Sequence, residues 1–306
     1  KATFNNGILA GNIQGAGDEA GWTFGGAAIN PRKNGSAANG TVDLGSSSAK
    51  LKDIHFGGTI NGVGISSNIT NFSNSILISQ DASTGTLSSA SDNTGLGTSV
   101  FDDLTSGTRN TAVGSGAFDV LTTGSQNVAI GRNAGGSLTT GDDSVFLGER
   151  AGSSTTTASD NTGVGQASLL SNTTGALNTA IGSGTLQANT TADNNTAVGY
   201  NSLTANTTGT QNTAVGANTG DAITTGSYNV GLGNNAIGSL TTGSNNVGLG
   251  VQALFNTTGS RNVAVGTTAM NANIGGSDNT AVGNNSLSAN TTGATLVAIG
   301  QNALAA

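Results

Sequence analysis

The chain has 306 residues, of which 50 are Gly, one is Pro and none is Cys, and 8% are charged. Its net charge of −7, with Lys and Arg scattered along the sequence, argues against a nucleic-acid partner. No run approaches the roughly 18 apolar residues that span a bilayer, so we expect no membrane insertion. Without Cys the chain has neither a disulfide nor a thiolate metal site.

The first 92 residues precede a long repeat. Residues 1–60 are rich in Gly and Asn, and we predict a small β-structured N-terminal module there. Residues 61–92 are interpreted as an entry cap, in which residues 74–78 form a degenerate strand with Asn74 at the place that Asn93 takes in the first full copy. A cap of this kind is expected because the end of a repeat array is an unpaired strand edge.

From residue 93 to residue 306 one pattern, N-T-A-V-G-x-x-A-L-x-x-N-T-T-G-x-x, occurs thirteen times. We number its positions 1 to 17. Eleven of the twelve spacings between copies equal the length of this pattern, and the spacing from Asn246 to Asn262 is shorter by one. Position 1 is Ser144 and Leu296 in two copies and Asn in the others, namely Asn93, Asn110, Asn127, Asn161, Asn178, Asn195, Asn212, Asn229, Asn246, Asn262 and Asn279.

A period of this length is too short for a βαβ unit, a propeller blade or a leucine-rich repeat. It predicts an all-β fold, a parallel β-solenoid or β-roll of about 13 coils, with like strands stacked about 4.8 Å apart. In such a stack the Asn amides lie above one another and can bond along the array, so we interpret the Asn column as a structural ladder.

Alternation along the strand places the Thr or Val of position 2 and the aliphatic residue of position 4 on one face. The Asn of position 1, the small residue of position 3 and the Gly of position 5 lie on the other face. A second apolar column stands at position 9, with Gly135, Gly152 and Gly220 as gaps. Neither face of the strand is charged, so one fills the coil and the other needs a partner. This predicts a rotationally symmetric homo-oligomer.

No catalytic constellation is present, so we expect a non-enzyme without a cofactor or a metal ion. His55 is the only His and is assigned to packing. Tyr200 and Tyr228 are the only Tyr and are the candidate surface or glycan contacts. Asp143 and Asp160 share position 17 in adjacent copies, which allows either a calcium site or, as we favour, two solvated acids.

Charged residues at the same turn position also suggest two ion pairs between adjacent coils, Asp92 with Arg109 and Arg261 with Asp278. Specific function is expected where the repeat fails: at Ser144, at Phe146, in the short copy 246–261, and at Tyr200 and Tyr228.

The N-T-A-V-G and N-V-A-I-G strands resemble the head repeats of trimeric autotransporter adhesins, which carry a similar Asn-x-Val-Ala-Ile-Gly motif. The full pattern, over residues 93–306, is more similar to repeats of bacteriophage tail fibres. Residues 41–60 are similar to the segment L-G-S-S-x-x-x-W-K-D-L-Y-x-x-G-x-I of such fibres, with Leu51 in place of the usual aromatic residue. The adhesin repeat is shorter than the pattern found here, so the second half of each coil can take a different course.

The resemblance implies a left-handed, trimeric β-roll and a structural attachment protein. It is expected to be a segment of a virion tail fibre, extracellular, that mediates or supports adhesion to a host surface glycan or protein receptor. The first alternative is the head of a bacterial trimeric adhesin, or an extracellular fibre, at the bacterial cell surface. The second is an ice-binding solenoid. This alternative is weakened because adjacent Thr side chains in a strand point to opposite faces, whereas a planar ice-binding array needs alternate Thr.

Overall fold

The computed structural model describes residues 32–33, 36–37, 59–60, 63–67, 72–73, 75–79 and 84–305. The chain divides into two compact units, Lys1–His55 and Phe56–Ala306. In the first unit, β1 (Arg32–Lys33) and β2 (Ser36–Ala37) form an antiparallel pair. The rest of the predicted N-terminal module, His55 included, lies outside the described residues.

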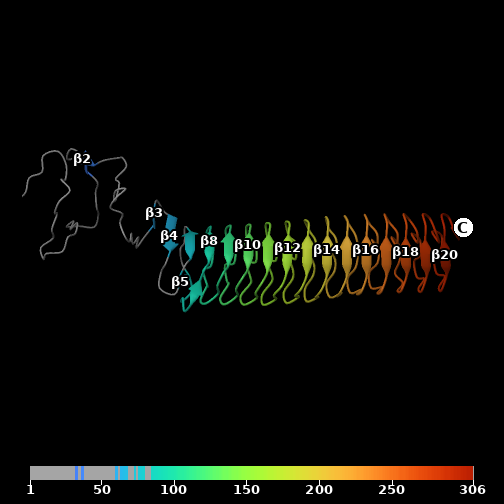
Figure 1. Cartoon of the computed structure of the whole chain (residues 1–306), viewed down its shortest axis with the longest axis horizontal. Helices are drawn as coiled ribbons and strands as arrows, with labels where there is room; N and C mark the ends of the chain where they lie inside the picture. Colours follow the sequence, from blue (N-terminus) through green and yellow to red (C-terminus); the bar gives the residue numbers. More distant parts are fainter. Residues whose placement is uncertain are drawn as a thin grey trace, which may run out of the picture. The chain divides into compact units, whose positions relative to one another are not determined.

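The second unit contains a parallel β-solenoid of about 13 turns, which confirms the predicted all-β class and repeat length (Figure 1). Each turn has one strand of three residues, and the described residues include no helix. The strands are β8 (Thr94–Leu96), β9 (Thr111–Val113), β10 (Val128–Ile130), β11 (Val145–Leu147), β12 (Thr162–Val164), β13 (Thr179–Ile181), β14 (Thr196–Val198), β15 (Thr213–Val215), β16 (Val230–Leu232), β17 (Val247–Leu249), β18 (Val263–Val265), β19 (Thr280–Val282) and β20 (Val297–Ile299).

Each strand pairs in parallel with the strand of the next coil, as in the pairing of Val128 with Val145. On the N-terminal side the same sheet continues through β6 (Ile76–Ser79), which is parallel to β8. Beyond it lie β4 (Val63–Ser67) and β3 (Thr59–Ile60), both antiparallel to their neighbours. A separate parallel pair joins β5 (Phe72–Ser73) to β7 (Ala90–Ser91).

The degenerate strand of the entry cap is present as β6, but its predicted register is wrong by one residue. Ile76 pairs with Thr94, so Ser75 and not Asn74 takes position 1. The backbone N–H of Asn93 donates to the Ser75 hydroxyl at 2.8 Å. A Ser oxygen can accept the bond that an Asn side chain accepts elsewhere, and this is why Ser is tolerated at that position.

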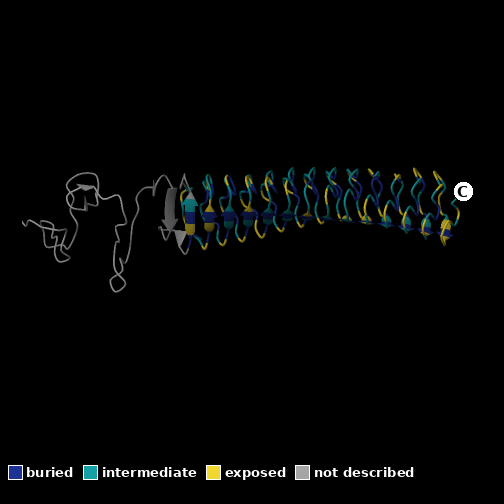
Figure 2. Ribbon diagram, turned by 90° about the horizontal axis from the view of Figure 1, so that it is seen from above, coloured by how far each residue is buried: buried dark blue, intermediate teal, exposed yellow. Residues whose placement is uncertain are grey.

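The small side chain of position 3 points into the coil, and the larger side chains of positions 2 and 4 point outward. Ala112, Ala180 and Ala214 are fully buried, whereas Leu96 and Leu232 are 49% and 51% exposed. Buried and exposed residues alternate in this way along the coils (Figure 2). The interior is filled from positions 9 and 12 and by the Asn of position 1. Its largest buried side chains are Phe101, Phe118, Phe146, Leu77, Leu104, Leu121, Leu138, Leu169, Leu186, Leu203 and Ile223.

The invariant Gly of position 5 is required by close stacking. Gly199 has φ = +130°, and a Cβ there would lie 2.5 Å from the carbonyl oxygen of Gly216 in the next coil. The corresponding Gly residues of the other coils have similarly positive φ values. Any side chain at this position would push adjacent coils apart, so the position carries stacking and not chemistry.

Candidate functional site

The Asn of position 1 closes its own coil and joins it to the previous one. In Asn110, Nδ2 donates to the carbonyl of Gly124 at 2.9 Å and to Oδ1 of Asn93 at 3.0 Å. Oδ1 of Asn93 also accepts the backbone N–H of Asn110 at 2.9 Å. These side chains are fully buried. All their bonds are internal to the protein, so the column offers nothing to a ligand.

A second Asn ladder, at position 12, was not predicted from the sequence. Asn189 donates to Oδ1 of Asn172 at 2.8 Å, and Asn206 donates to Oδ1 of Asn189 at 3.0 Å. All three side chains are buried. The signal that could have revealed the ladder was the recurrence of Asn in consecutive coils. The ladder ends at Ile223 in the next coil, and Oδ1 of Asn206 is left buried without a hydrogen-bond partner.

The two Thr columns of the outer turn have different environments. At position 13 the hydroxyl donates to a backbone carbonyl of the next coil, as from Thr173 to Thr190 at 2.9 Å. At position 14 the side chains are exposed, as at Thr174 and Thr191. The Thr-Thr pairs therefore present one free column of Thr and not two.

Phe146, which breaks the small-residue column, is a core residue and not a functional exception. It is fully buried and occupies the space left by two gaps in the position 9 column. A Cβ at Gly152 would lie 2.2 Å from the ring of Phe146, and one at Gly135 would lie 3.1 Å from it. The large side chain has moved from position 9 to position 3, and the volume of the interior is preserved.

Ser144 and the short copy 246–261 also have structural explanations. Ser144 is buried, and its hydroxyl accepts the backbone N–H of Asn161 at 3.2 Å. The short copy has one residue fewer than the others, and the missing residue comes from the turn that leads to Gly259. Asn246 reaches the carbonyl of Gly259 at a separation of 13 residues, where the other coils have 14. The strands on either side keep their register, because Val247 still pairs with Val263.

One of the two expected ion pairs forms. Nε and Nη2 of Arg261 donate to the Asp278 carboxylate at 2.6 and 2.9 Å, and this bond lowers the pKa of Asp278. Arg109 does not meet Asp92 and instead donates to Gln126 at 3.3 Å. An amide in the following coil takes the place of the expected carboxylate, so this prediction was wrong.

The Asp pair considered as a calcium site lies on the surface. Asp143 accepts a bond from the side chain of Gln126 at 2.8 Å. Among the described residues there is no group of three or more His, Asp or Glu that could hold a metal ion. Elsewhere, burial and the nearby Asp103 raise the pKa of Asp119, and burial raises the pKa of Asp221. Asp119 and Asp221 belong to distant coils, so they do not form a shared site.

Tyr200 and Tyr228 are 59% and 54% exposed. Tyr200 follows β14 and Tyr228 precedes β16, so they lie on opposite edges of the sheet. The structure does not bring them into one site within the chain.

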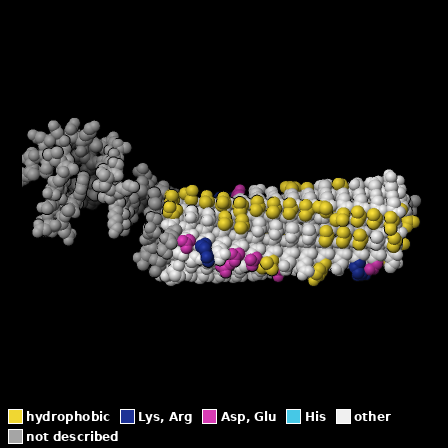
Figure 3. All heavy atoms as spheres, viewed as in Figure 1, with side chains coloured by type: hydrophobic (Ala, Val, Ile, Leu, Met, Phe, Trp, Pro, Cys, Tyr) yellow, Lys and Arg dark blue, Asp and Glu magenta, His cyan; other side chains and the backbone are white. Residues whose placement is uncertain are grey.

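The position 4 side chains make a continuous apolar column on the outside of the sheet. No member of the column is buried, and Ile130, Ile181 and Ile299 are 42%, 41% and 72% exposed. Figure 3 shows hydrophobic side chains in a row along the solenoid, with further hydrophobic side chains beside it toward the C-terminal coils. There, Val230 and Val297 of position 2 are exposed as well. This outer face is the surface feature most in need of a partner.

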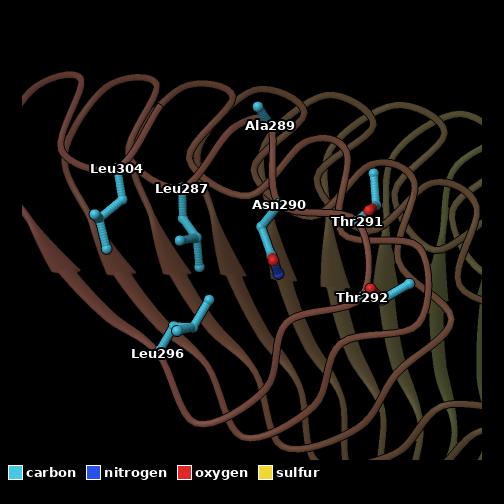
Figure 4. Close-up of a pocket in the computed structure, with 7 residues that line it drawn as sticks. All are labelled: Leu287, Ala289, Asn290, Thr291, Thr292, Leu296 and Leu304. Atoms are coloured by element: carbon cyan, nitrogen blue, oxygen red, sulfur yellow. The ribbon is translucent and has the colours of Figure 1, made fainter. Parts of the chain in front are cut away.

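A hollow of about 350 Å³ lies at the last described coils (Figure 4). Leu287, Leu296, Leu304 and Asn290 contribute to its lining. These residues hold positions 1, 9 and 12, which form the buried interior of the earlier coils. The hollow is therefore a part of the core that is more open here than in those coils. It gathers no titratable side chain.

The described residues contain no helix that could cross a bilayer. No protein-family model, no curated protein and no solved structure matches the chain. The surface of the solenoid is therefore the only guide to its function among the described residues.

Proposed function

We propose that the chain is a segment of a homotrimeric attachment fibre that holds or presents a receptor-binding surface, most simply a bacteriophage tail fibre in the virion. The observation that supports this most is the unbroken outward column of aliphatic side chains at position 4. In a monomer this column would remain in water over the whole length of the sheet.

The magnitude of the apolar surface favours association. Complete burial of a Val, Leu or Ile side chain contributes about 1.5–3 kcal/mol. Six of the thirteen side chains are at least 36% exposed and the others are less exposed. Burying the exposed part, roughly a third on average, would contribute on the order of 7–14 kcal/mol per chain, or about 20–40 kcal/mol for three chains. Each of the two association steps of a trimer costs about 4–15 kcal/mol in lost freedom, so a full-length interface is favourable. The choice of three copies comes from the resemblance to trimeric β-rolls.

Sedimentation equilibrium of the purified chain tests the oligomer. The wild type is expected to be trimeric, and Val198→Asp with Val215→Asp should give a folded monomer because two outward aliphatic side chains become charged. The matched control is Thr174→Asp with Thr191→Asp, on exposed turns of adjacent coils, which should leave the trimer intact. A wild type that stays monomeric at micromolar concentration would refute the proposal.

Binding of the labelled chain to candidate host bacteria, with and without their surface glycans, tests attachment. We expect saturable binding that weakens when the glycans are stripped. Tyr228→Ala should weaken binding to untreated cells, which keep their glycans, if its exposed ring stacks on a sugar. If the chain is a trimer but binds no cell, its role would be that of a spacer in the fibre and not that of a receptor-binding surface. Binding to animal cells or matrix, and not to bacteria, would favour the adhesin alternative.

The ice-binding alternative is supported by the exposed Thr column at position 14. It is weakened by the position 13 hydroxyls, which are bonded to backbone carbonyls and so do not extend the column into a two-dimensional array. Thermal hysteresis of the purified protein would rescue this alternative.

A further inference from the structure

The charged side chains beside β10, β11 and β12 are divided between the two edges of the sheet. Each strand crosses the sheet face in three residues, so the residues just before and just after it lie on opposite edges. Asp142, Asp143 and Asp160 lie on the edge where the strands begin, which we call the leading edge. Arg132 and Arg150 lie on the trailing edge, where the strands end. Figure 3 shows more acidic than basic side chains along one edge of the row of strands.

Contacts within the chain leave this distribution unbalanced. Arg132 pairs with Glu149, which is also on the trailing edge. Arg150 and Asp160 are exposed and have no ion pair among the described residues. The leading edge thus carries three negative charges here. The trailing edge carries one net positive charge, from two Arg less one Glu.

We propose that the partner of the outer face is a second copy of this chain in parallel and in register, with Arg150 of one copy beside Asp143 and Asp160 of the next. The inference rests on the homo-oligomer of the proposed function and adds the orientation of the copies and the residues that set it. A rotation about an axis parallel to the solenoid keeps every coil at its own height. It brings the leading edge of one sheet against the trailing edge of its neighbour, so opposite charges meet.

An antiparallel arrangement does not use these charges. It inverts the heights of the coils and brings like edges together. With full overlap of the repeats, Asp143 would face Asn245, and Asp160 would face Tyr228, so neither acid meets a cation.

Exposed apolar side chains at the edges support the parallel arrangement independently. Leu177, 55% exposed, lies on the leading edge before β13, and Tyr200, 59% exposed, lies on the trailing edge after β14. Their strands are one rung apart, about 4.8 Å. A parallel ring places the two side chains at neighbouring heights on facing edges, where both lose exposed apolar surface.

The charges at the rim are expected to select orientation and register more than to add affinity, because exposed ion pairs are weak and like charges repel in wrong registers. The apolar column cannot do this alone, since its aliphatic side chains repeat at every coil and permit slippage along the axis.

Disulfide trapping tests the arrangement directly, because the chain has no Cys of its own. The test variant is the full chain with Asp143→Cys and Arg150→Cys, which puts one thiol on each edge at the same height. The backbone tolerates side chains here, since Leu177 and Tyr228 adopt the φ of Asp143, and Asn201 and Thr268 that of Arg150. Mild oxidation should close a covalent ring that appears as a trimer on a denaturing gel and reverts on reduction. The control, Asp143→Cys with Asn245→Cys, should remain unlinked.

The outcomes separate this inference from the proposed function. Linking of the control pair would show antiparallel copies and overturn the inference. In a chain that sediments as a trimer, no linking of the test pair either by oxidation or by a short bismaleimide, which spans the longer Cα separation of an Arg–Asp contact, would also overturn it. A monomeric wild type would overturn the homo-oligomer itself and the inference with it.

A charge swap checks the same contact without oxidation. Arg150→Glu should weaken association about two- to five-fold at low salt, with a smaller effect at high salt because the pair is exposed. Adding Asp143→Arg and Asp160→Arg should restore association. Asn235→Glu, in the same column but at the height of the uncharged Tyr228 and Asn245, should have no effect. Failure of the swap to restore association would count against the contact.

Discussion

At the scale of single residues, the buried Asn of position 1 is the main determinant of the coil. Asn178 donates to the carbonyl of Ala192 at 2.8 Å and accepts the backbone N–H of Asn195 at 3.0 Å. A side chain of this size that both donates and accepts can replace water for two backbone groups at once. This explains why the most polar column of the repeat lies inside the protein.

Asn178→Leu should be strongly destabilising. It leaves the backbone N–H of Asn195 without its acceptor and removes one of the two side-chain bonds to the carbonyl of Ala192, the other of which comes from Asn189. A buried unpaired polar group costs about 1–3 kcal/mol, so we expect a loss of about 1–3 kcal/mol in the free energy of unfolding. Urea denaturation measures this loss. The control is Asn194→Leu, at an exposed position where the preceding coil already has Leu177, and it should change stability by less than about 0.5 kcal/mol. Equal effects of the two substitutions would contradict the role of the ladder.

Phe146 and Gly152 form a compensating pair that a double-mutant cycle can resolve. Phe146→Ala should cost about 3–5 kcal/mol through the cavity it leaves. Gly152→Leu alone should also destabilise, because its Cβ would lie 2.2 Å from the Phe146 ring. The double variant recreates the Ala and Leu of the coil that contains Ala180 and Leu186, so it should be more stable than either single variant. Thermal unfolding of the four proteins measures the coupling, and additive losses would refute it.

At the scale of elements, the sequence predicted the strands well because their period and alternation are local signals. It did not predict which strand face points inward. The large aliphatic residues of position 4 are the usual core formers, yet positions 9 and 12 already fill the narrow coil and leave room for Ala112 or Gly163 only. The structural role of Phe146 was also beyond the pattern, because the gap and the side chain that fills it lie in different columns and different coils.

The position 12 ladder supplies a prediction at this scale. Ile223→Asn would place a donor beside Oδ1 of Asn206, which has no partner, and should cost much less than Leu121→Asn. Leu121 lies between Leu104 and Leu138, so an Asn there would meet no amide in either adjacent coil. Ile223→Asn gains a hydrogen bond to Asn206, whereas Leu121→Asn gains none and adds one buried unpaired oxygen. The two losses in the free energy of unfolding should therefore differ by about 2–4 kcal/mol. Chemical denaturation of both variants tests this, and a larger loss at Ile223 would show that packing outweighs the ladder.

At the scale of the whole molecule, the solenoid is a one-dimensional stack in which each coil contacts its neighbours in sequence. The short coil that begins at Asn246 already shows that a change in one turn leaves the adjacent strands in register. Stability should accordingly be a sum of contributions from coils and from the contacts between them. Each added coil also adds one aliphatic side chain to the outer apolar column, so the area of the proposed oligomer interface increases with the length of the solenoid.

Removal of one complete coil should therefore be tolerated. Deletion of residues 178–194 would bring Asn161 next to Asn195 and Asn172 next to Asn206, so both Asn ladders continue, and Leu169 would stack on Leu203. We expect a folded protein that is shorter by about 4.8 Å, with a small loss of stability and the same oligomeric state, because every copy loses the same rung. Small-angle scattering measures the length, and circular dichroism measures the melting. Deletion of residues 178–186, about half a coil, would set a strand against an outer turn and should abolish cooperative unfolding. Equal tolerance of the two deletions would show that the register between coils does not hold the solenoid together.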